Sequence, residues 1–302
     1  MKSIQLVKRI GVYLFIAFSW LLGRVPHFIL YGLADIVYVL LYYIIGYRRK
    51  VVYKNLRNSF PEKSDKEIRL IAKKFFHHLS DIFVENIALI KMSKKRVLQM
   101  VEYEKTDIPK KLFNDKKSII GVTGHYSNWE LYLTLPEILP HLVIGVYKPL
   151  NNKFFDKQFY KMREKFNAIP VTMADSYKTV LKYNKENTLT FLGLVADQRP
   201  PKEGGHYWTT FLNQETAIFL GPEKIATKLN SAIIFIYSEK IRRGKYLVKI
   251  KQLFEDTSEC KEHEITETHV RFLENLIKEK PEYWLWSHKR WKHKRDSETP
   301  LH

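Results

Sequence analysis

The stretch Ser118–Leu135, SIIGVTGHYSNWELYLTL, contains an abrupt change of local pattern. Its first part, 118–123, is a short apolar run with several β-branched residues, and it stops at Gly124 as a buried strand does. From Ser127 onward the apolar spacing becomes helical. The stretch therefore predicts a strand, a short loop that carries His125, and a helix.

His125 and Glu130 are candidate catalytic groups. A histidine at the carboxyl end of a strand, with a carboxylate one turn into the next helix, suits a general base and the group that orients it. On one continuous helix the two side chains would lie about 140° apart around the axis, but the loop before the helix lets them face each other. A second interpretation stays open, because Ser127 and Glu130 also have capping-box spacing. In that case Glu130 satisfies only a backbone N–H.

Strands and helices alternate after this stretch. Further strands are predicted at 142–147, 169–172 and 188–195, and helices between them at 154–166 and 175–184. This order predicts an α/β fold with a mixed, largely parallel sheet flanked by helices. In such sheets function gathers at the carboxyl ends of the strands, so we expect His125, Lys148 and Asp197 to meet there. Gln198 follows Asp197, and a Pro/Gly loop at 199–207 is expected beside the site.

The last third of the chain predicts more elements and an unusual tail. Residues 214–229 are expected to form a helix that Gly221-Pro222 breaks or restarts. Segments 232–237 and 246–253 predict a hairpin at the antiparallel margin of the sheet, and 265–279 an amphipathic helix. The tail, 283–295, interleaves tryptophans with basic residues, a pattern typical of single-stranded nucleic-acid binding and of membrane interfaces.

Composition limits the classes of partner. A chain of 302 residues can bury a full core, and its 45% hydrophobic content excludes disorder. The net charge of +19 favours anionic partners: nucleic acid, acidic lipid headgroups, phosphorylated substrates or an acidic carrier protein. Cys260 is the only cysteine, which excludes an intramolecular disulfide and a cysteine-based zinc site and fits a reducing, cytoplasm-facing environment.

Two apolar stretches open the chain. Ile10–Leu22 is too short to span a bilayer, whereas Phe28–Gly46 would be about 28 Å long as a helix and matches the hydrocarbon core. Its apolar side chains contribute about −5 kcal/mol and the central Asp35 costs about +3 kcal/mol. We expect residues 1–50 to form a membrane anchor and 51–302 the catalytic domain, with everything after Tyr47 in the cytoplasm by the positive-inside rule. A buried amphipathic hairpin stays an alternative; a secretory signal peptide lacks its small-residue cleavage site after Leu22.

Two helices are predicted between these parts. A short basic helix covers 51–61, and a capping box at Ser64–Glu67 opens a long helix with a continuous apolar stripe. Asp81, Glu85 and Asn86 lie near this stripe and are interpreted as buried structural polar groups.

Seven segments, in this order, resemble the membrane-bound lysophospholipid-type acyltransferases, and more narrowly their lipid A lauroyl/myristoyl acyltransferase branch. They are RRKVVYKNLRNSFP (48–61), GHYSNWE (124–130), VYKPLNN (146–152), the segment around Arg163, ADQ (196–198), GPEKIA (221–226) and PEYWLWSHKRWK (281–292). The resemblance covers nearly the whole chain.

The resemblance implies a specific reaction. An acyl chain would pass from an acyl thioester, with acyl carrier protein as the expected donor, to a hydroxyl of a lipid A precursor at the cytoplasmic face of the bacterial inner membrane. No cofactor or metal is implied, and no Ser nucleophile of the G-x-S-x-G type is present, as direct transfer allows.

The resemblance also assigns residues. His125 matches the general base and Glu130 the acid that orients it. Arg163 matches a basic position associated with the acceptor's anionic groups, and Lys148 stands where many relatives have an arginine, so the bidentate contact is lost there. Substrate-binding positions are completed by Asp197 and Gln198, which match the family's Asp-Gln block, and by Asn128 within the histidine motif.

Four alternatives differ in how much of the sequence they explain. The acceptor could be a different membrane glycolipid or aminolipid. A nucleic-acid-binding protein would explain the charge and the tail but not the apolar N-terminus, and a membrane scaffold would have no use for charged residues at strand ends. A metallohydrolase is disfavoured because no H-E-x-x-H pattern is present.

Overall fold

A seven-stranded sheet forms the centre of the molecule. The computed structural model describes the backbone of residues 2–200 and 207–302, and the side chains from residue 11 onward within those ranges. The strand order is β1-β9-β8-β2-β5-β3-β4. The strands are β1 (Val101–Tyr103), β2 (Ile119–Thr123), β3 (Leu142–Tyr147), β4 (Ile169–Thr172), β5 (Thr190–Val195), β8 (Ala232–Arg242) and β9 (Lys245–Phe254). All neighbours pair in parallel except β8 and β9, which confirms the predicted mixed, largely parallel sheet and its antiparallel hairpin.

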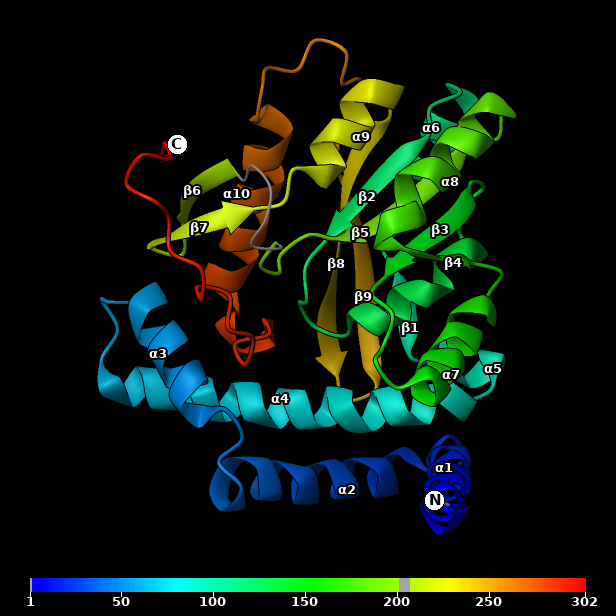
Figure 1. The fold of residues 1–302 in the computed structure, drawn as a ribbon, viewed down its shortest axis with the longest axis vertical. Helices are drawn as coiled ribbons and strands as arrows, with labels where there is room; N and C mark the ends of the chain where they lie inside the picture. The colour runs from blue at the N-terminus through cyan, green and yellow to red at the C-terminus, as the bar shows by residue number, and fades with distance from the viewer. Residues whose placement is uncertain (1, 201–206) are drawn as a thin grey trace.

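Helices flank this sheet on both faces and below it (Figure 1). They are α3 (Arg49–Ser59), α4 (Asp65–Lys91), α5 (Lys94–Gln99), α6 (Ile108–Asn114), α7 (Lys153–Glu164), α8 (Met173–Lys185), α9 (Gly221–Leu229) and α10 (Glu264–Glu279), with short 3-10 helices η2 (Trp129–Glu137) and η3 (Pro281–Tyr283). The predicted capping box at the start of α4 is confirmed, since Ser64 and Glu67 bond each other's backbone N–H. Asp81 and Glu85 are fully buried on α4, as predicted for structural polar groups.

The prediction of a helix over 214–229 is wrong in its first half. Residues 214–218 form strand β7 (Gln214–Ile218), which pairs antiparallel with β6 (Tyr207–Phe211) in a separate two-stranded sheet. Leu212 and Asn213 both have positive φ, the conformation of a two-residue hairpin turn. Helix α9 then starts at Gly221, because Pro222 lacks an N–H and fits only the first turn. Of the predicted loop 199–207, residues 201–206 lie outside the described residues.

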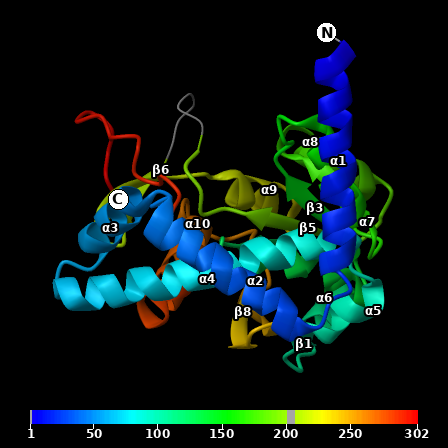
Figure 2. The ribbon, with the colours of Figure 1, turned by 90° about the horizontal axis from the view of Figure 1, so that it is seen from below.

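The N-terminal helices form a layer beneath α4. Helix α1 (Lys2–Leu22) and helix α2 (His27–Val39), which continues as a π-helical turn, η1 (Leu40–Ile44), both pack against α4. Figure 1 shows α2 running along the lower side of α4 with α1 nearly end-on at the same level, and Figure 2 shows both nearest the viewer from below. Within the described part of the chain, segment 27–44 alone is long and apolar enough to cross a membrane, a test that core helices and signal sequences also pass.

One face of α2 belongs to the folded core. Leu30 and Ala34 are fully buried, and the Tyr31 hydroxyl donates to the buried Glu85 of α4 over 2.6 Å. Asp35, the charge that disfavours a span, pairs with Arg243 from the β8–β9 turn. The predicted membrane anchor and the domain boundary at residue 50 stay predictions, and α2 is tied to the rest of the protein by polar as well as apolar contacts.

Candidate active site

The register of the sheet brings His125 and Asp197 together. Strands β2 and β5 are parallel neighbours, and their last residues, Thr123 and Val195, are paired. His125 and Asp197 each follow two residues later, so the two side chains leave the same edge of the sheet side by side. This confirms that the carboxyl ends of these two strands gather the polar residues, as parallel topology requires.

Asp197 holds His125 by two contacts. Its Oδ1 lies 2.6 Å from His125 Nδ1, and its Oδ2 accepts the backbone N–H of His125 over 2.8 Å. The indole N–H of Trp284 donates to the same Oδ2 over 2.8 Å. Burial works against ionisation of Asp197, yet its interactions with His125 and the hydrogen bond from Trp284 hold the pKa of the carboxyl below its ordinary value. Asp197 is therefore an ionised, buried carboxylate with only acceptor atoms.

The contacts determine which nitrogen of His125 carries the proton. Because an ionised carboxylate can only accept, Nδ1 is the protonated nitrogen and Nε2 keeps its lone pair. The side-chain nitrogen of Gln198 lies 3.0 Å from Nε2, where its amide N–H can donate to that lone pair. The imidazole is 17% exposed, so its basic nitrogen lies at the margin of solvent rather than in the core.

The predicted contact between Glu130 and His125 is not formed in the structure, where Asp197 contacts the imidazole and Glu130 pairs with Arg163. Glu130 lies in the first turn of a 3-10 helix rather than an α-helix, and its Oε2 lies 3.2 Å from Nη2 of Arg163 on α7. The alternative capping box is also absent, because Ser127 has a φ of 57° and its buried hydroxyl has no hydrogen-bond partner. Local spacing pointed to Glu130 because Asp197, the carboxylate that contacts Nδ1, is 72 residues away along the chain. The sequence did predict that strands end at Thr123 and Val195, and pairing those two ends would have placed Asp197 next to His125.

Two further candidates lie away from His125. Asn128 was expected to bind substrate, but it is fully buried and donates its amide to Glu85 Oε2 over 2.6 Å, so it anchors the loop to α4 instead. Lys148 is exposed just beyond the end of β3 and forms no hydrogen bond or ion pair with the residues that the structure describes. Arg163 is not paired with Asp156 or Glu164, the acidic residues of its own helix.

An apolar cavity of about 120 Å³ lies beside His125. Trp129 lines it and packs its ring edge-on against the His125 imidazole, with 4.9 Å between ring centroids. Glu130 and Arg163 also line the cavity and are 16% and 23% exposed, so the ion pair marks its polar end. The guanidinium stacks over Tyr147 at 5.3 Å from the ring centroid, which holds it at this end.

Three glycines make the room for this cavity. Gly121 of β2, Gly193 of β5 and Gly145 of β3 are paired in one row across the sheet and line the cavity. A Cβ on Gly145 would meet no atom within 4 Å, whereas a Cβ on Gly121 would lie 2.1 Å from the ring of Phe191. The row therefore leaves a shallow groove on the sheet face, with Phe191 filling it over β2.

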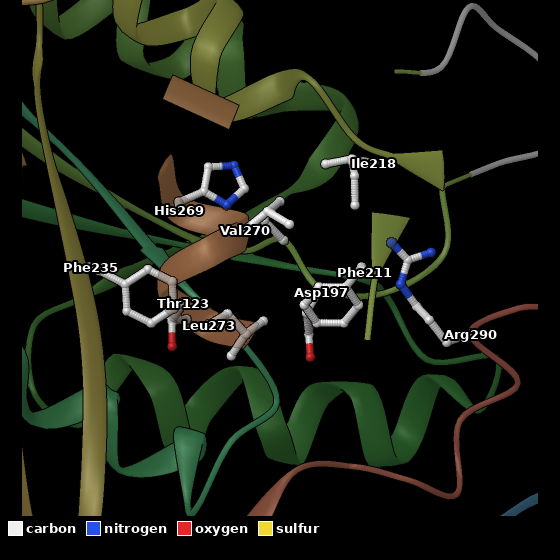
Figure 3. Close-up of a pocket in the computed structure, with 10 residues that line it drawn as sticks. Thr123, Asp197, Phe211, Ile218, Phe235, His269, Val270, Leu273 and Arg290 are labelled. Atoms are coloured by element: carbon white, nitrogen blue, oxygen red, sulfur yellow. The ribbon is translucent and has the colours of Figure 1, made fainter. Parts of the chain in front are cut away.

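Two tryptophans of the C-terminal tail are buried in the protein, while its lysines stay exposed. Trp284 and Trp286 are 2% and 0% exposed, so the interpretation of these tryptophans as a membrane or nucleic-acid surface is wrong. Figure 3 shows Arg290 of the tail and His269 of α10 on a small void behind Asp197, whose volume of about 10 Å³ is that of a single water. Burial lowers the pKa of Arg290 to about 10, which still leaves a cation near Asp197 at neutral pH.

Comparison with known proteins gives the family. Residues 1–293 match the family model of the bacterial lipid A biosynthesis acyltransferases. The chain belongs to this family. A search of curated proteins returned no significant match. The family makes this acyltransferase an enzyme of lipopolysaccharide biosynthesis, and no three His, Cys, Asp or Glu residues in the described part of the chain are grouped to hold a metal ion.

Proposed function

We propose that this lipid A acyltransferase uses His125 as general base to transfer a fatty acyl chain from an acyl thioester to a hydroxyl of a lipid A precursor. The single observation that carries the proposal is the buried Asp197 carboxylate on Nδ1, which leaves the Nε2 lone pair directed outward. Nε2 takes the hydroxyl proton while the oxygen attacks the thioester carbonyl. The C–S bond then breaks, and the imidazolium gives the proton to the departing thiolate, so an ester and a free thiol result.

Gln198 is proposed to contact His125 before the acceptor binds and to stabilise the thioester oxygen during acyl transfer. In the unliganded enzyme its amide occupies Nε2 at 3.0 Å, the position that the acceptor hydroxyl must take. When the hydroxyl displaces it, the same amide N–H remains close enough to donate to the thioester oxygen as negative charge develops there. Preorganised donors of this kind contribute about 10²–10³-fold to rate in acyl transfer.

The apolar cavity is proposed to hold the fatty acyl chain. It adjoins His125 through Trp129, and its walls are the glycine row and the side chains of β3 and β4. A chain laid along this groove would present its thioester carbonyl at the polar end, next to the base. Arg163, fixed there by Glu130, is proposed to contact an anionic group of the acceptor, with Lys148 available at the exposed margin.

The N-terminal layer is proposed to rest in the membrane at the cytoplasmic face of the inner membrane. Phe28 and Ile36 of α2 and Ile44 of η1 are 76%, 59% and 69% exposed. Crossing the bilayer would carry α4, with its exposed lysines, and the Asp35–Arg243 pair into the hydrocarbon, at a cost of about 2.5–3.5 kcal/mol for each charge. We therefore infer that α2 lies flat in one leaflet rather than spanning it. The positive surface also suits acyl carrier protein, an acidic donor.

Mass spectrometry of membrane lipids tests the proposed reaction. A deletion strain should accumulate lipid A that lacks one acyl chain, and the wild-type gene but not His125→Ala should restore it, since loss of a general base costs about 10²–10⁴-fold. Loss of a chain from another glycolipid or an aminolipid would identify a different acceptor. Restoration by His125→Ala at equal abundance would refute the assigned base.

Assays with the purified enzyme distinguish acyl carrier protein from coenzyme A as the acyl donor. Release of free thiol is measured with the same acyl chain on acyl carrier protein and on coenzyme A. We expect the carrier protein to be preferred at low salt and its advantage to shrink as salt rises, because exposed charges are screened beyond about 10 Å at 0.1 M. An equal rate with both thioesters, unaffected by salt, would contradict the carrier-protein proposal.

A further inference from the structure

A second pocket, separate from the site, lies where α2, α4 and the β8–β9 turn meet. Its volume is about 520 Å³, and it shares no lining residue with the cavity beside His125. Tyr38 of α2 forms one wall, and the others come from α4, from the end of β8 with the β8–β9 turn, and from η3. We refer to it as the basic pocket.

Positive charge dominates this pocket. Five lining residues are cationic, Lys73, Lys74, Lys240, Arg242 and Arg243, while Asp81 and Glu282 are the acidic ones. The inner cations are neutralised, because Lys240 lies 2.7 Å from the buried Asp81 and Arg243 pairs with Asp81 and Asp35.

The outer cations differ from the inner ones. The side chains of Lys73 and Arg242 are exposed and form no ion pair or hydrogen bond within the described ranges, and the Lys74 side chain makes only a loose contact of 4.0 Å with Glu282. The pocket therefore offers uncompensated positive charge at its rim over a floor held rigid by ion pairs.

The apolar surface beside the pocket identifies the occupant. Tyr38 is followed on α2 by Val39 and Leu40, which are 45% and 40% exposed, and Ile241 on the opposite rim is 51% exposed. A free phosphate would use the charges but leave these side chains in water. A phospholipid would use both, since its phosphate fits the cations and its acyl chains cover the apolar rim.

We propose that the basic pocket binds the phosphate of an anionic membrane phospholipid, whose acyl chains lie along the outward face of α2. The inference rests on the proposed placement of α2 in the membrane. Such a lipid is neither donor nor acceptor. It fixes α2, and with it α4, at a defined height on an anionic leaflet, where each nearby basic residue strengthens binding roughly fivefold.

Thermal unfolding of the full-length protein in detergent micelles tests the pocket. Ligands that bind only the folded state raise Tm by mass action, so the shift reports lipid binding without an activity assay. Phosphatidylglycerol should raise Tm, while phosphatidylcholine with the same chains and inorganic phosphate should not. Equal shifts with both lipids, or an equal shift with inorganic phosphate, would overturn the proposal.

A pair of double variants makes the test specific. Lys73→Ala with Arg242→Ala removes the two unpaired cations and should weaken phosphatidylglycerol binding roughly 25-fold. The matched control, Lys178→Ala with Lys185→Ala, removes the same charge from exposed positions on α8, at the opposite end of the molecule from α2 (Figure 1), and should keep the full shift. If both double variants lose the shift equally, net charge rather than the pocket is responsible and the proposal fails.

Kinetics separate this proposal from the proposed reaction. In detergent micelles that contain no added phospholipid, the Lys73/Arg242 variant should have the same acceptor KM and the same kcat as the wild type. A selective rise in the acceptor KM would show that the basic pocket holds the acceptor's own phosphate, which contradicts a separate phospholipid site. Absence of acyl transfer in the wild type would refute the proposed reaction but leave the Tm result for the pocket intact.

Discussion

Asp197 orients both the ring and the backbone of His125. One oxygen fixes the tautomer at Nδ1, and the other fixes the loop by accepting the backbone N–H of the same residue. Trp284 supplies a further donor, so the carboxylate cannot rotate without breaking a bond. At the scale of residues, the orientation of His125, the proposed base, depends in this structure on Asp197 rather than on Glu130.

Replacing Asp197 by Asn should abolish most turnover while keeping the shape of the site. The amide can donate to Nδ1, which favours the tautomer that carries its proton on Nε2 and cannot accept one from the acceptor. We expect kcat to fall by about 10²–10⁴-fold. The measurement is single-turnover transfer at saturating donor and acceptor.

Glu130→Gln tests whether Glu130 has the same role as Asp197. It should leave kcat within about tenfold and mainly raise the acceptor KM, because Arg163 loses the charged partner that positions it. If Glu130→Gln lowered kcat as far as Asp197→Asn while KM stayed constant, Glu130 would be the orienting acid in the working enzyme.

Helix α4 supports the catalytic loop through Glu85. This carboxylate has no exposed surface and accepts hydrogen bonds from Tyr31 of α2, Tyr246 of β9 and Asn128 of the loop. Burial raises the pKa of Glu85, and the hydrogen bonds from the two tyrosine hydroxyls oppose this rise without cancelling it. Three elements that are distant in the sequence therefore meet at one buried carboxylate.

Glu85→Ala should destabilise the protein by about 3–5 kcal/mol, because buried donors lose their acceptor and a cavity is left. Glu85→Gln should cost less, since an amide oxygen still accepts. Denaturant unfolding measures both, with Lys66→Ala on the exposed side of the same helix as the control, expected within about 0.5 kcal/mol of wild type. A cost for Glu85→Ala no greater than the control's would show that the network contributes nothing to stability.

Substitution in the glycine row tests the proposal that the acyl chain lies along the face of the sheet. Gly145→Val places a side chain in open space, so folding should be unaffected while the groove becomes shorter or narrower. The variant should prefer shorter acyl thioesters than the wild type, measured by competition among donors of different chain length. Gly121→Val is not equivalent, because its Cβ would collide with Phe191. An unchanged chain-length profile in a folded Gly145→Val enzyme would place the acyl chain elsewhere.

The whole molecule should lose stability on mild acidification. Burial lowers the pKa of His78, His141, His269 and His288, the last two to about 4, so all four are neutral in the folded protein at pH 7. Unfolding exposes them to water, where they take up protons below about pH 6.5. The unfolded state thus binds more protons, and the free energy of unfolding should fall between about pH 6.5 and 4.

His269→Leu removes one of the four histidines and so measures its share of the loss of stability in acid. Each proton that only the unfolded state binds changes the slope by about 1.4 kcal/mol per pH unit, so the variant should be less sensitive to acid by about that amount. Denaturant unfolding at pH 7, 6 and 5 measures the slope. Asp197, with its lowered pKa, contributes in the same direction only below about pH 4. Parallel slopes for variant and wild type would mean that His269 titrates normally.

The sequence by itself determined the periodic elements and the edge of the sheet at which the chemistry lies. Predicted strands at 142–147 and 169–172 match β3 and β4 residue for residue, and the capping box at Ser64 forms as predicted. These features depend on residues within one or two turns of each other, so the local pattern carries them. The segment 214–229 failed because a two-residue hairpin turn without glycine gives little local signal before Gly221.

Only the tertiary structure decided the partners. The choice of Asp197 over Glu130, the burial of Trp284 and the anchoring of Asn128 by Glu85 all join residues at least 43 positions apart. Which of several carboxylates reaches a given nitrogen depends on strand register and helix type, and both are set by packing across the whole core. For the same reason the apolar segment 27–44, which joins α2 and η1, is long enough to span a bilayer, yet the contacts of α2 with Glu85 and Arg243 tie it to the domain.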